Sequence, residues 1–288
     1  MNRLAATGLA LMSAAMMLPA QTQNPTFSSK VEAVRVDVLV TRDGKPVPGL
    51  RAADFEILDN GVRQAVDIVS FEQLPLNVVF TFDLSDSIIG DRLVNLREAG
   101  HAVLGALRKG DQSALVTFNH AVVVGSGLTA DAGLVRAAID GTEPAGNTSL
   151  TDAVFAGMML AESDVGRGLV IVFSDGLDTS SWLRPKAVLD VAKRSDAVVY
   201  AVSAGLASRS AFLGDLTGDT GGRLFKIEST RSLSAVFLEV LNEFRQRYLL
   251  SYSPTGVSQE GCHQLTVRVR NRDATVRARP GYLAGAPM

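Results

Sequence analysis

Apolar and polar residues follow two different rhythms along the chain, and the change between them divides it. From Phe27 to Gln73 the two kinds alternate, most clearly in Val31–Val40, as in a strand with one face in water. An Asp-Asn-Gly turn at positions 59–61 precedes a further predicted strand, Gln64–Phe71. We therefore predict a small antiparallel unit of about four strands, which is too small to be stable alone.

After Pro75 the pattern changes to an alternation of strands and helices. Continuous apolar runs indicate buried strands, and apolar positions at helical spacing indicate helices. The predicted strands are Asn77–Phe82, Ser113–Phe118, Ala121–Val124, Leu169–Phe173, Ala197–Val202 and Arg223–Ile227, and the predicted helices are Asp91–Leu107, Ala130–Ile139, Ser149–Ala161, Pro185–Lys193 and Leu233–Arg247. This order predicts an α/β fold with a mainly parallel sheet and helices on both faces.

The β rhythm returns at Tyr248 and continues through the runs Gln264–Arg270 and Ala274–Ala278. Neither this segment, residues 248–284, nor the N-terminal segment, residues 27–73, has enough strands to stand alone. Because the termini of a domain often lie close together, we expect the two segments to pack as one sandwich-like unit.

The first twenty residues differ from the rest of the chain. Arg3 is followed by an apolar run from Leu4 to Leu18 and then by Pro19 and Ala20, the layout of a signal peptide cleaved after Ala20. The alternative is an uncleaved membrane anchor, although the run is short and rich in alanine for a membrane span. We expect a secreted or periplasmic protein with no stable membrane span after cleavage.

The net charge narrows the classes of partner, and the cysteine content limits what can stabilise the fold. A net charge of -2 over 288 residues gives no field to hold nucleic acid or an anionic membrane. The single cysteine, Cys262, cannot form an internal disulfide, so the fold must rely on its apolar core.

Oxygen-bearing side chains lie at three turns of the α/β part. Asp83, Ser85 and Ser87 come after the first buried strand, Thr148 lies in a Gly-Asn-Thr turn, and Asp175 follows the apolar strand 169–173. Adjacent parallel strands bring their carboxyl ends to one edge of a sheet, so these turns are expected to meet. Two carboxylates and three hydroxyls, without His or Cys, favour a hard divalent cation over zinc or copper.

Plainer roles are open for the same residues. Asp83, Ser85 and Ser87 suit a helix cap, while Thr148 and Asp175 suit simple turns. Three further sets of residues are expected to lie outside the metal site. Asp86 and Asp178 are predicted to be solvated, with shaping the site as the alternative. Trp182 is predicted to pack, with lining a partner surface as the alternative, and His101, His120 and His263 to be surface or helix residues.

Three motifs carry a resemblance to a known family. DLSDS, GNT and VIVFSDG resemble the three loops of von Willebrand factor type A (VWFA) domains. The resemblance implies a Rossmann-like VWFA domain over residues 76–247 with a metal-ion-dependent adhesion site for Mg²⁺, or else Mn²⁺ or Ca²⁺. In that site Ser85, Ser87 and Thr148 would contact the ion, and Asp83 and Asp175 would hold it directly or through water.

The flanking segments are similar to those of VWFA-related secreted proteins of Acidobacteria. This second resemblance rests on VRVDVLVTRDGKPVPGL before the domain and on RYLLSYSP and VRARPGY after it. It covers nearly the whole mature chain and implies little about activity.

Two functions follow from these observations. The first is a secreted, non-enzymatic module that binds an unidentified protein by capturing a carboxylate through the cation. The alternative is a metal-dependent hydrolase or phosphatase at the same site. Against the alternative, Ser85 stands where an aspartate-nucleophile enzyme needs a second carboxylate. The three loops also contain no Lys or Arg, and the chain has no Gly-x-Ser-x-Gly motif.

Overall fold

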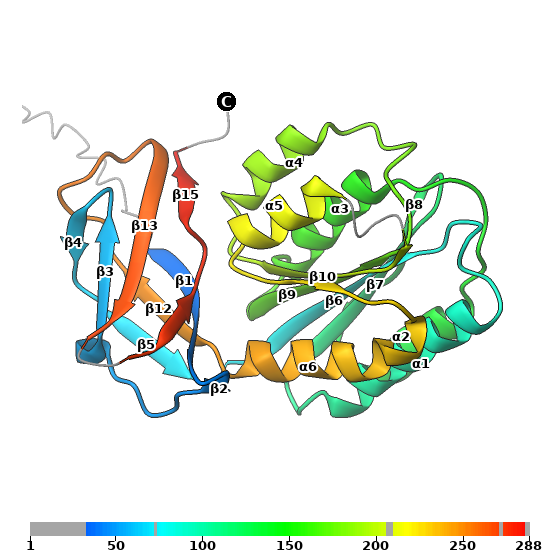
Figure 1. The fold of residues 1–288 in the computed structure, drawn as a ribbon, viewed down its shortest axis with the longest axis horizontal. Helices are drawn as coiled ribbons and strands as arrows, with labels where there is room; N and C mark the ends of the chain where they lie inside the picture. Colours follow the sequence, from blue (N-terminus) through cyan, green and yellow to red (C-terminus); the bar gives the residue numbers. More distant parts are fainter. Residues whose placement is uncertain (1–32, 72–73, 206–209, 271–272, 286–288) are drawn as a thin grey trace, which may run out of the picture. The chain divides into compact units, whose positions relative to one another are not determined.

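A computed structural model describes residues 33–71, 74–205, 210–270 and 273–285 of the chain (Figure 1). The predicted signal peptide, residues 1–20, lies outside the described residues, as does its cleavage position. Within the described ranges, no helix has both the length and the apolar character needed to cross a bilayer.

The centre of the α/β part is a six-stranded sheet. In their order across the sheet the strands are β11 (Leu224–Lys226), β10 (Val198–Ser203), β9 (Arg167–Ser174), β6 (Leu76–Asp83), β7 (Gln112–Phe118) and β8 (Val122–Thr129). All neighbours are parallel except β7 and β8. Every residue of β6 and β9 is buried, as expected of central strands covered on both faces. The predicted α/β class is therefore confirmed.

Helices cover both faces of this sheet (Figure 1). One face packs against α1 (Asp91–Ala106), α2 (Ala132–Asp140) and α6 (Leu233–Arg245), and the other against α3 (Leu150–Ala161), α4 (Pro185–Ala192) and α5 (Ala211–Asp219). Helix α5 was not among the helices expected from the sequence. Its Gly and Thr residues have weak helical propensity, but burial of Leu213 and Leu216 against the sheet holds it in place.

The strands before and after the α/β part form two further sheets. The first contains β14 (Thr275–Arg277), β1 (Val34–Arg42), β12 (Tyr248–Tyr252) and β5 (Ile68–Phe71) in that order, with β2 (Lys45–Pro46) beside β1. The second contains β15 (Gly281–Ala284), β13 (Gly261–Val269), β3 (Phe55–Asp59) and β4 (Val62–Gln64). Two short 3₁₀ helices, η1 (Ala52–Asp54) and η3 (Thr230–Ser232), complete the described elements.

These two sheets interleave strands from the two ends of the chain. β1 pairs antiparallel with β12, and β3 pairs antiparallel with β13. The expectation of one strand over Gln64–Phe71 is wrong. β4 and β5 belong to different sheets, and residues 65–67 between them carry the chain from one sheet to the other.

A buried polar cluster lies in the core of this β unit. The Asp59 carboxylate accepts hydrogen bonds from the hydroxyls of Tyr252 (2.9 Å) and Tyr282 (2.8 Å), and its other oxygen lies 2.7 Å from His263 Nδ1. Burial raises the pKa of both tyrosines, which keeps them as protonated donors. The expectation that His263 lies at the surface is wrong, because an aspartate on β3 gives it a buried partner.

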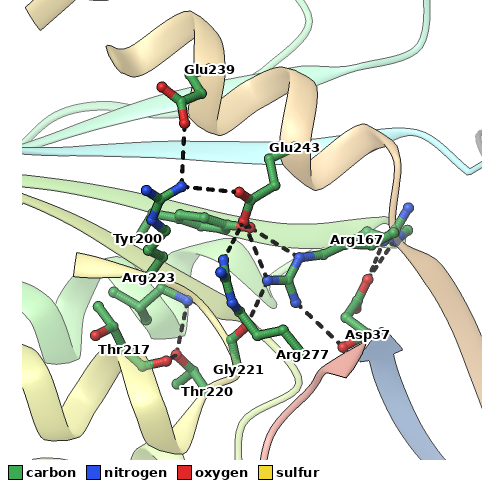
Figure 2. Close-up of polar contacts among 12 residues, drawn as sticks. Asp37, Arg167, Tyr200, Thr217, Thr220, Gly221, Arg223, Glu239, Glu243 and Arg277 are labelled. Carbon is green, nitrogen blue, oxygen red and sulfur yellow. Dashed lines mark hydrogen bonds and ion pairs between the residues drawn. The ribbon is translucent and has the colours of Figure 1, made fainter. Parts of the chain in front are cut away.

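A second buried cluster joins the β unit to the α/β part. We call it the arginine junction; it consists of Asp37, Arg167, Tyr200, Glu243, Arg247 and Arg277 (Figure 2). Arg247, which has no exposed side-chain surface, donates to the Tyr200 hydroxyl at 3.0 Å and to the Gly221 carbonyl at 2.6 Å. Arg167 at the start of β9 pairs with Asp37 of β1. Charged groups from both parts therefore satisfy one another near the amino ends of the sheet strands.

Candidate metal centre

The site is built at the carboxyl ends of β6 and β9. These strands are parallel neighbours, with Phe82 opposite Phe173, so the loops that follow them leave the same edge of the sheet. Ser174, the last residue of β9, donates its hydroxyl to Asp83 Oδ2 at 2.6 Å. The backbone N–H of Ser85 donates to Asp83 Oδ1 at 2.9 Å. Asp83 is fully buried and fixed at both oxygens.

The first and third loops touch through hydroxyl and carboxylate groups. The Ser85 and Ser87 hydroxyl oxygens lie 3.1 Å apart, and Ser87 donates to Asp175 Oδ1 at 2.6 Å. Asp175 is buried, whereas Ser87 is exposed. Four of the five residues singled out from the sequence therefore form one connected group.

The second loop is tied to the first by backbone hydrogen bonds. Ala145 N donates to the Leu84 carbonyl at 2.8 Å, and Asp86 N donates to the Gly146 carbonyl at 3.0 Å. Gly146 N in turn donates to Asp86 Oδ1 at 2.7 Å. Asp86, expected to be only solvated, is exposed but also holds these two loops together.

Thr148, the fifth residue singled out, lies against the third loop. Its carbonyl accepts from the backbone N–H of Thr179 at 2.9 Å. Its hydroxyl oxygen lies only 3.2 Å from where a Cβ atom on Gly176 would be, so the missing side chain of Gly176 allows the close approach. Thr148 is buried beside the residue that follows Asp175.

The donor set suits a small, hard dication. Ligand oxygens at neighbouring corners of an octahedron around Mg²⁺ are about 2.9 Å apart, given metal–oxygen distances of 2.0–2.1 Å. The 3.1 Å between the Ser85 and Ser87 hydroxyl oxygens is close to this separation. Nowhere in the described ranges do three or more His, Cys, Asp or Glu side chains gather to hold a metal ion. An ion at this edge would therefore depend on hydroxyl as well as carboxylate oxygens.

The electrostatic surroundings of Asp83 also suit a bound cation. Burial raises the pKa of Asp83, although hydrogen bonds from Ser174 and Ser85 oppose the change, and the neighbouring Asp175 charge raises it further. The ionised form of Asp83 is therefore disfavoured by its surroundings. A dication nearby would favour that form, because an opposite charge within a few ångströms stabilises a carboxylate.

Arg92 is a site residue that the sequence interpretation missed. It lies in the first turn of α1, and its Nη1 is 2.5 Å from Asp175 Oδ2 and 3.2 Å from the Ser87 carbonyl oxygen. The three loops themselves contain no basic residue, whereas Arg92 reaches the third loop from the helix. The signal in the sequence is position: Arg92 lies five residues after Ser87, in the first turn of the helix that follows the first loop.

Asp178 is a second residue whose role differs from the expectation. It was predicted to be solvated, but Asp178 Oδ2 accepts from Thr151 N at 2.8 Å and from Thr151 Oγ1 at 2.5 Å, and its Oδ1 accepts from Ser181 N at 3.1 Å. Burial alone would raise the pKa of Asp178, but these hydrogen bonds outweigh it and lower the pKa below the usual value. Asp178 thus holds the third loop against the start of α3.

Comparison with known proteins bears on the fold and the family. Residues 77–239 match the family model for the von Willebrand factor type A domain. Bovine inter-alpha-trypsin inhibitor heavy chain H1 is 24% identical over 233 aligned residues, covering 74% of this chain and 26% of that protein. The mouse heavy chain H2 is 25% identical over 237 residues, covering 74% of this chain and 25% of that protein. The chain thus spans about a quarter of the length of these relatives.

Solved structures with a similar fold include a mussel byssus protein, proximal thread matrix protein 1. One crystal form has a TM-score of 0.53 at 20% identity, covering 63% of this chain and 49% of that one. A structure of the same protein with a zinc-occupied MIDAS motif has a TM-score of 0.54 at 18% identity, covering 63% of this chain and 48% of that one. At these identities the likeness shows the fold alone.

Proposed function

The chain belongs to the von Willebrand factor type A domain family, and from this premise we propose that it is a metal-dependent protein-binding module. The observation that supports the proposal is the meeting of three loops at one sheet edge, with five oxygen-bearing residues on them: Asp83, Ser85, Ser87, Thr148 and Asp175. Of the three hydroxyl-bearing residues at this edge, Ser85 and Thr148 are buried and Ser87 is exposed, and both carboxylates are buried.

Each of these side chains has a proposed part in holding a divalent cation. Ser85 and Ser87 would supply neutral oxygens at neighbouring positions, and Thr148 a third from the second loop. Asp83 and Asp175 would supply the negative charge, directly or through water. When bound, such a cation supplies positive charge and a coordination position for an outside oxygen ligand. We propose that a carboxylate on a partner protein fills that position.

The cation we propose is Mg²⁺, with Mn²⁺ or Ca²⁺ as alternatives. The oxygen-only donor set supports these hard ions. The zinc in the MIDAS motif of the mussel protein shows that this fold also accommodates Zn²⁺ in that case, so zinc belongs in any test of ion preference.

We propose no enzymatic role for this edge. Ser85 occupies the position two residues after Asp83 at which an aspartate-nucleophile phosphatase needs a second carboxylate. Arg92 is engaged with Asp175 and the Ser87 carbonyl rather than directed at an open substrate site. For location we propose secretion or export to the periplasm, supported by the signal-peptide pattern of residues 1–20.

A metal titration tests the proposal. Isothermal titration calorimetry with Mg²⁺ is expected to show one site in the wild type and at least about 100-fold weaker binding in Ser85→Ala, since even supporting residues around a metal cost up to that much. Ser163→Ala removes an exposed hydroxyl that bonds only the Leu160 carbonyl, and is expected to bind like the wild type. Equal Mg²⁺ affinity in wild type and Ser85→Ala would contradict the proposal.

A further inference from the structure

Trp182 is exposed to an unusual degree for a tryptophan. Its exposed fraction is 94%, although tryptophan is highly buried on average. It is the single tryptophan of the chain and lies seven residues after Asp175, on the segment that continues the third loop. The favoured expectation that Trp182 packs within the protein is wrong, and the alternative, that it lines a partner surface, stays a prediction.

Hydrogen bonds hold Trp182 in this exposed position. The Asp152 carboxylate, in the first turn of α3, accepts from the backbone N–H groups of Trp182 at 2.9 Å and of Leu183 at 2.8 Å. Ser181 Oγ accepts from Asp152 N at 3.2 Å, and Ser180 Oγ lies 3.0 Å from Ser149 Oγ. The loop is anchored to α3, so the exposure of Trp182 is imposed by the surrounding structure.

A hollow of about 480 Å³ lies beside the indole and next to the proposed metal site. Its walls include Trp182, Phe155, Val122 and Leu183, together with Ser149. Ser149 directly follows Thr148 in the chain, so one wall of the hollow is the residue next to a proposed metal ligand. A hollow of this size has room for a large side chain.

The chemistry of the hollow favours an apolar occupant. Apart from the exposed His120, its polar side chains already serve the protein: both Asp152 oxygens accept from the loop backbone, and the Ser149 hydroxyl contacts Ser180. The Asp152 charge also disfavours a second acid there. Two further apolar side chains stand exposed on the metal loops themselves, Ile89 (65%) and Leu177 (43%).

We propose that Trp182 and this hollow form the second half of the partner site and take a bulky aliphatic or aromatic side chain. That side chain would lie within a few residues of the acidic residue that reaches the metal edge, as we call the sheet edge with the five proposed ligands, because Ser149 of the hollow directly follows Thr148 of that edge. The partner is thus a protein segment with an acid flanked by an apolar residue. Exposed, rigidly held aromatic residues are typical anchors of protein interfaces. This inference rests on the proposed function.

A peptide array tests the inference. The probes are immobilised nonapeptides with a central Asp in a Gly/Ser background, in which one position within three residues of the Asp is Leu, Phe, Ala, Ser or Lys. A matching set carries Asn in place of Asp. Full-length protein is applied with Mg²⁺ as wild type, Trp182→Ser, Trp182→Phe and Ser85→Ala. Tryptophan emission of the wild type, which comes from Trp182 alone, is recorded with the best-bound soluble peptide.

We expect the wild type to bind Leu or Phe peptides about tenfold better than the Ala peptide, as for a hydrophobic pocket. Trp182→Ser is expected to lose this preference but keep the requirement for Asp, Trp182→Phe to keep both, and Ser85→Ala to lose binding. Tryptophan emission is expected to shift to shorter wavelength. An Asp requirement without an apolar preference, or a preference unchanged in Trp182→Ser, overturns this inference alone. Binding that ignores Asp, or no binding to any peptide, overturns the proposed function as well.

Discussion

The two ends of the central sheet carry polar clusters of opposite character. Near the amino ends, the arginine junction surrounds its carboxylates with guanidinium groups: Glu243 accepts from Arg277 at 2.9 Å and from the Tyr200 hydroxyl at 2.6 Å (Figure 2). At the carboxyl ends, and among the residues that the structure describes, Asp83 has only hydroxyl and backbone donors, and Asp175 has one guanidinium, that of the half-exposed Arg92. One cluster is complete within the chain, whereas the other has room for a further positive charge.

This difference separates a structural cluster from the proposed binding site. Buried charges that are paired and hydrogen-bonded inside the chain hold two parts of the molecule together and offer nothing to a ligand. Carboxylates gathered at a loop edge beside neutral hydroxyls contribute little to the stability of the fold, but they attract a cation. Substitutions at the two ends are therefore expected to have different consequences, stability at one and binding at the other.

The largest effect on stability is expected at the arginine junction. Arg247→Met keeps most of the side-chain volume but leaves the Gly221 carbonyl and the Tyr200 hydroxyl without their donor. We expect the free energy of unfolding to fall by about 3 kcal/mol, the lower end of the range for breaking a buried ion pair, because Glu243 keeps Arg277.

Urea denaturation measures this loss, with the exposed Arg231→Met on η3 as the matched control. Mg²⁺ affinity of folded Arg247→Met is expected to equal that of the wild type. A stability loss no larger than that of the control would contradict the structural role of the arginine junction.

A smaller effect, a gain in Mg²⁺ affinity rather than a loss of stability, is expected when Arg92 at the metal edge is replaced. Its guanidinium competes with a dication for Asp175, so Arg92→Gln is expected to raise Mg²⁺ affinity. Because Arg92 is half-exposed, its ion pair is worth no more than about 1 kcal/mol, which corresponds to about fivefold in affinity. Calorimetric titration at low and high salt measures the change. A lower affinity in Arg92→Gln would show instead that Arg92 positions Asp175 for the ion.

The smallest effect is expected at Asp178, which anchors the loop carrying Trp182. Its pKa is lower in the folded protein than the usual 3.8, so its hydrogen bonds stabilise the fold above that pH and are lost as pH falls through the lowered pKa. Asp178→Asn is expected to cost about 0.5 kcal/mol near pH 6, after allowing for its partial exposure.

The difference between Asp178→Asn and wild type is expected to shrink as the pH is lowered below 3.8, when measured by urea denaturation at several pH values. Asp215→Asn, at an exposed position of α5, is the control and is expected to show no such change. A difference that stays constant or grows on acidification would contradict the stabilising role of the ionised Asp178.

The sequence predicted the central sheet and its loops well because those signals are local. The continuous apolar runs of β6 and β9, and the oxygen-bearing residues at their ends, appear as unbroken stretches of sequence. Features that depend on distant partners were missed. Helix α5 forms through contact of Leu213 and Leu216 with the sheet, and the burial of His263 depends on Asp59, 204 residues away.

At the metal edge, too, the features missed from the sequence are those that depend on residues distant in the chain. Asp83, Ser85, Ser87 and Asp175 were identified because they end or follow strands, whose ends parallel pairing brings together. Thr148 was identified from the Gly-Asn-Thr turn between two helices. Arg92 was missed because it reaches Asp175 from a helix, a contact between residues 83 positions apart. The exposure of Trp182 was only the less favoured alternative from the sequence, because it depends on Asp152, which lies 30 residues before it.

The most direct test of the metal edge is a crystal structure of the protein grown with Mn²⁺, using its anomalous scattering to locate the ion. The account predicts a single strong anomalous peak within about 2.3 Å of the Ser85 and Ser87 hydroxyl oxygens, beside Asp83, Thr148 and Asp175. A map with no peak at this edge, or with the ion bound elsewhere on the protein, would contradict it.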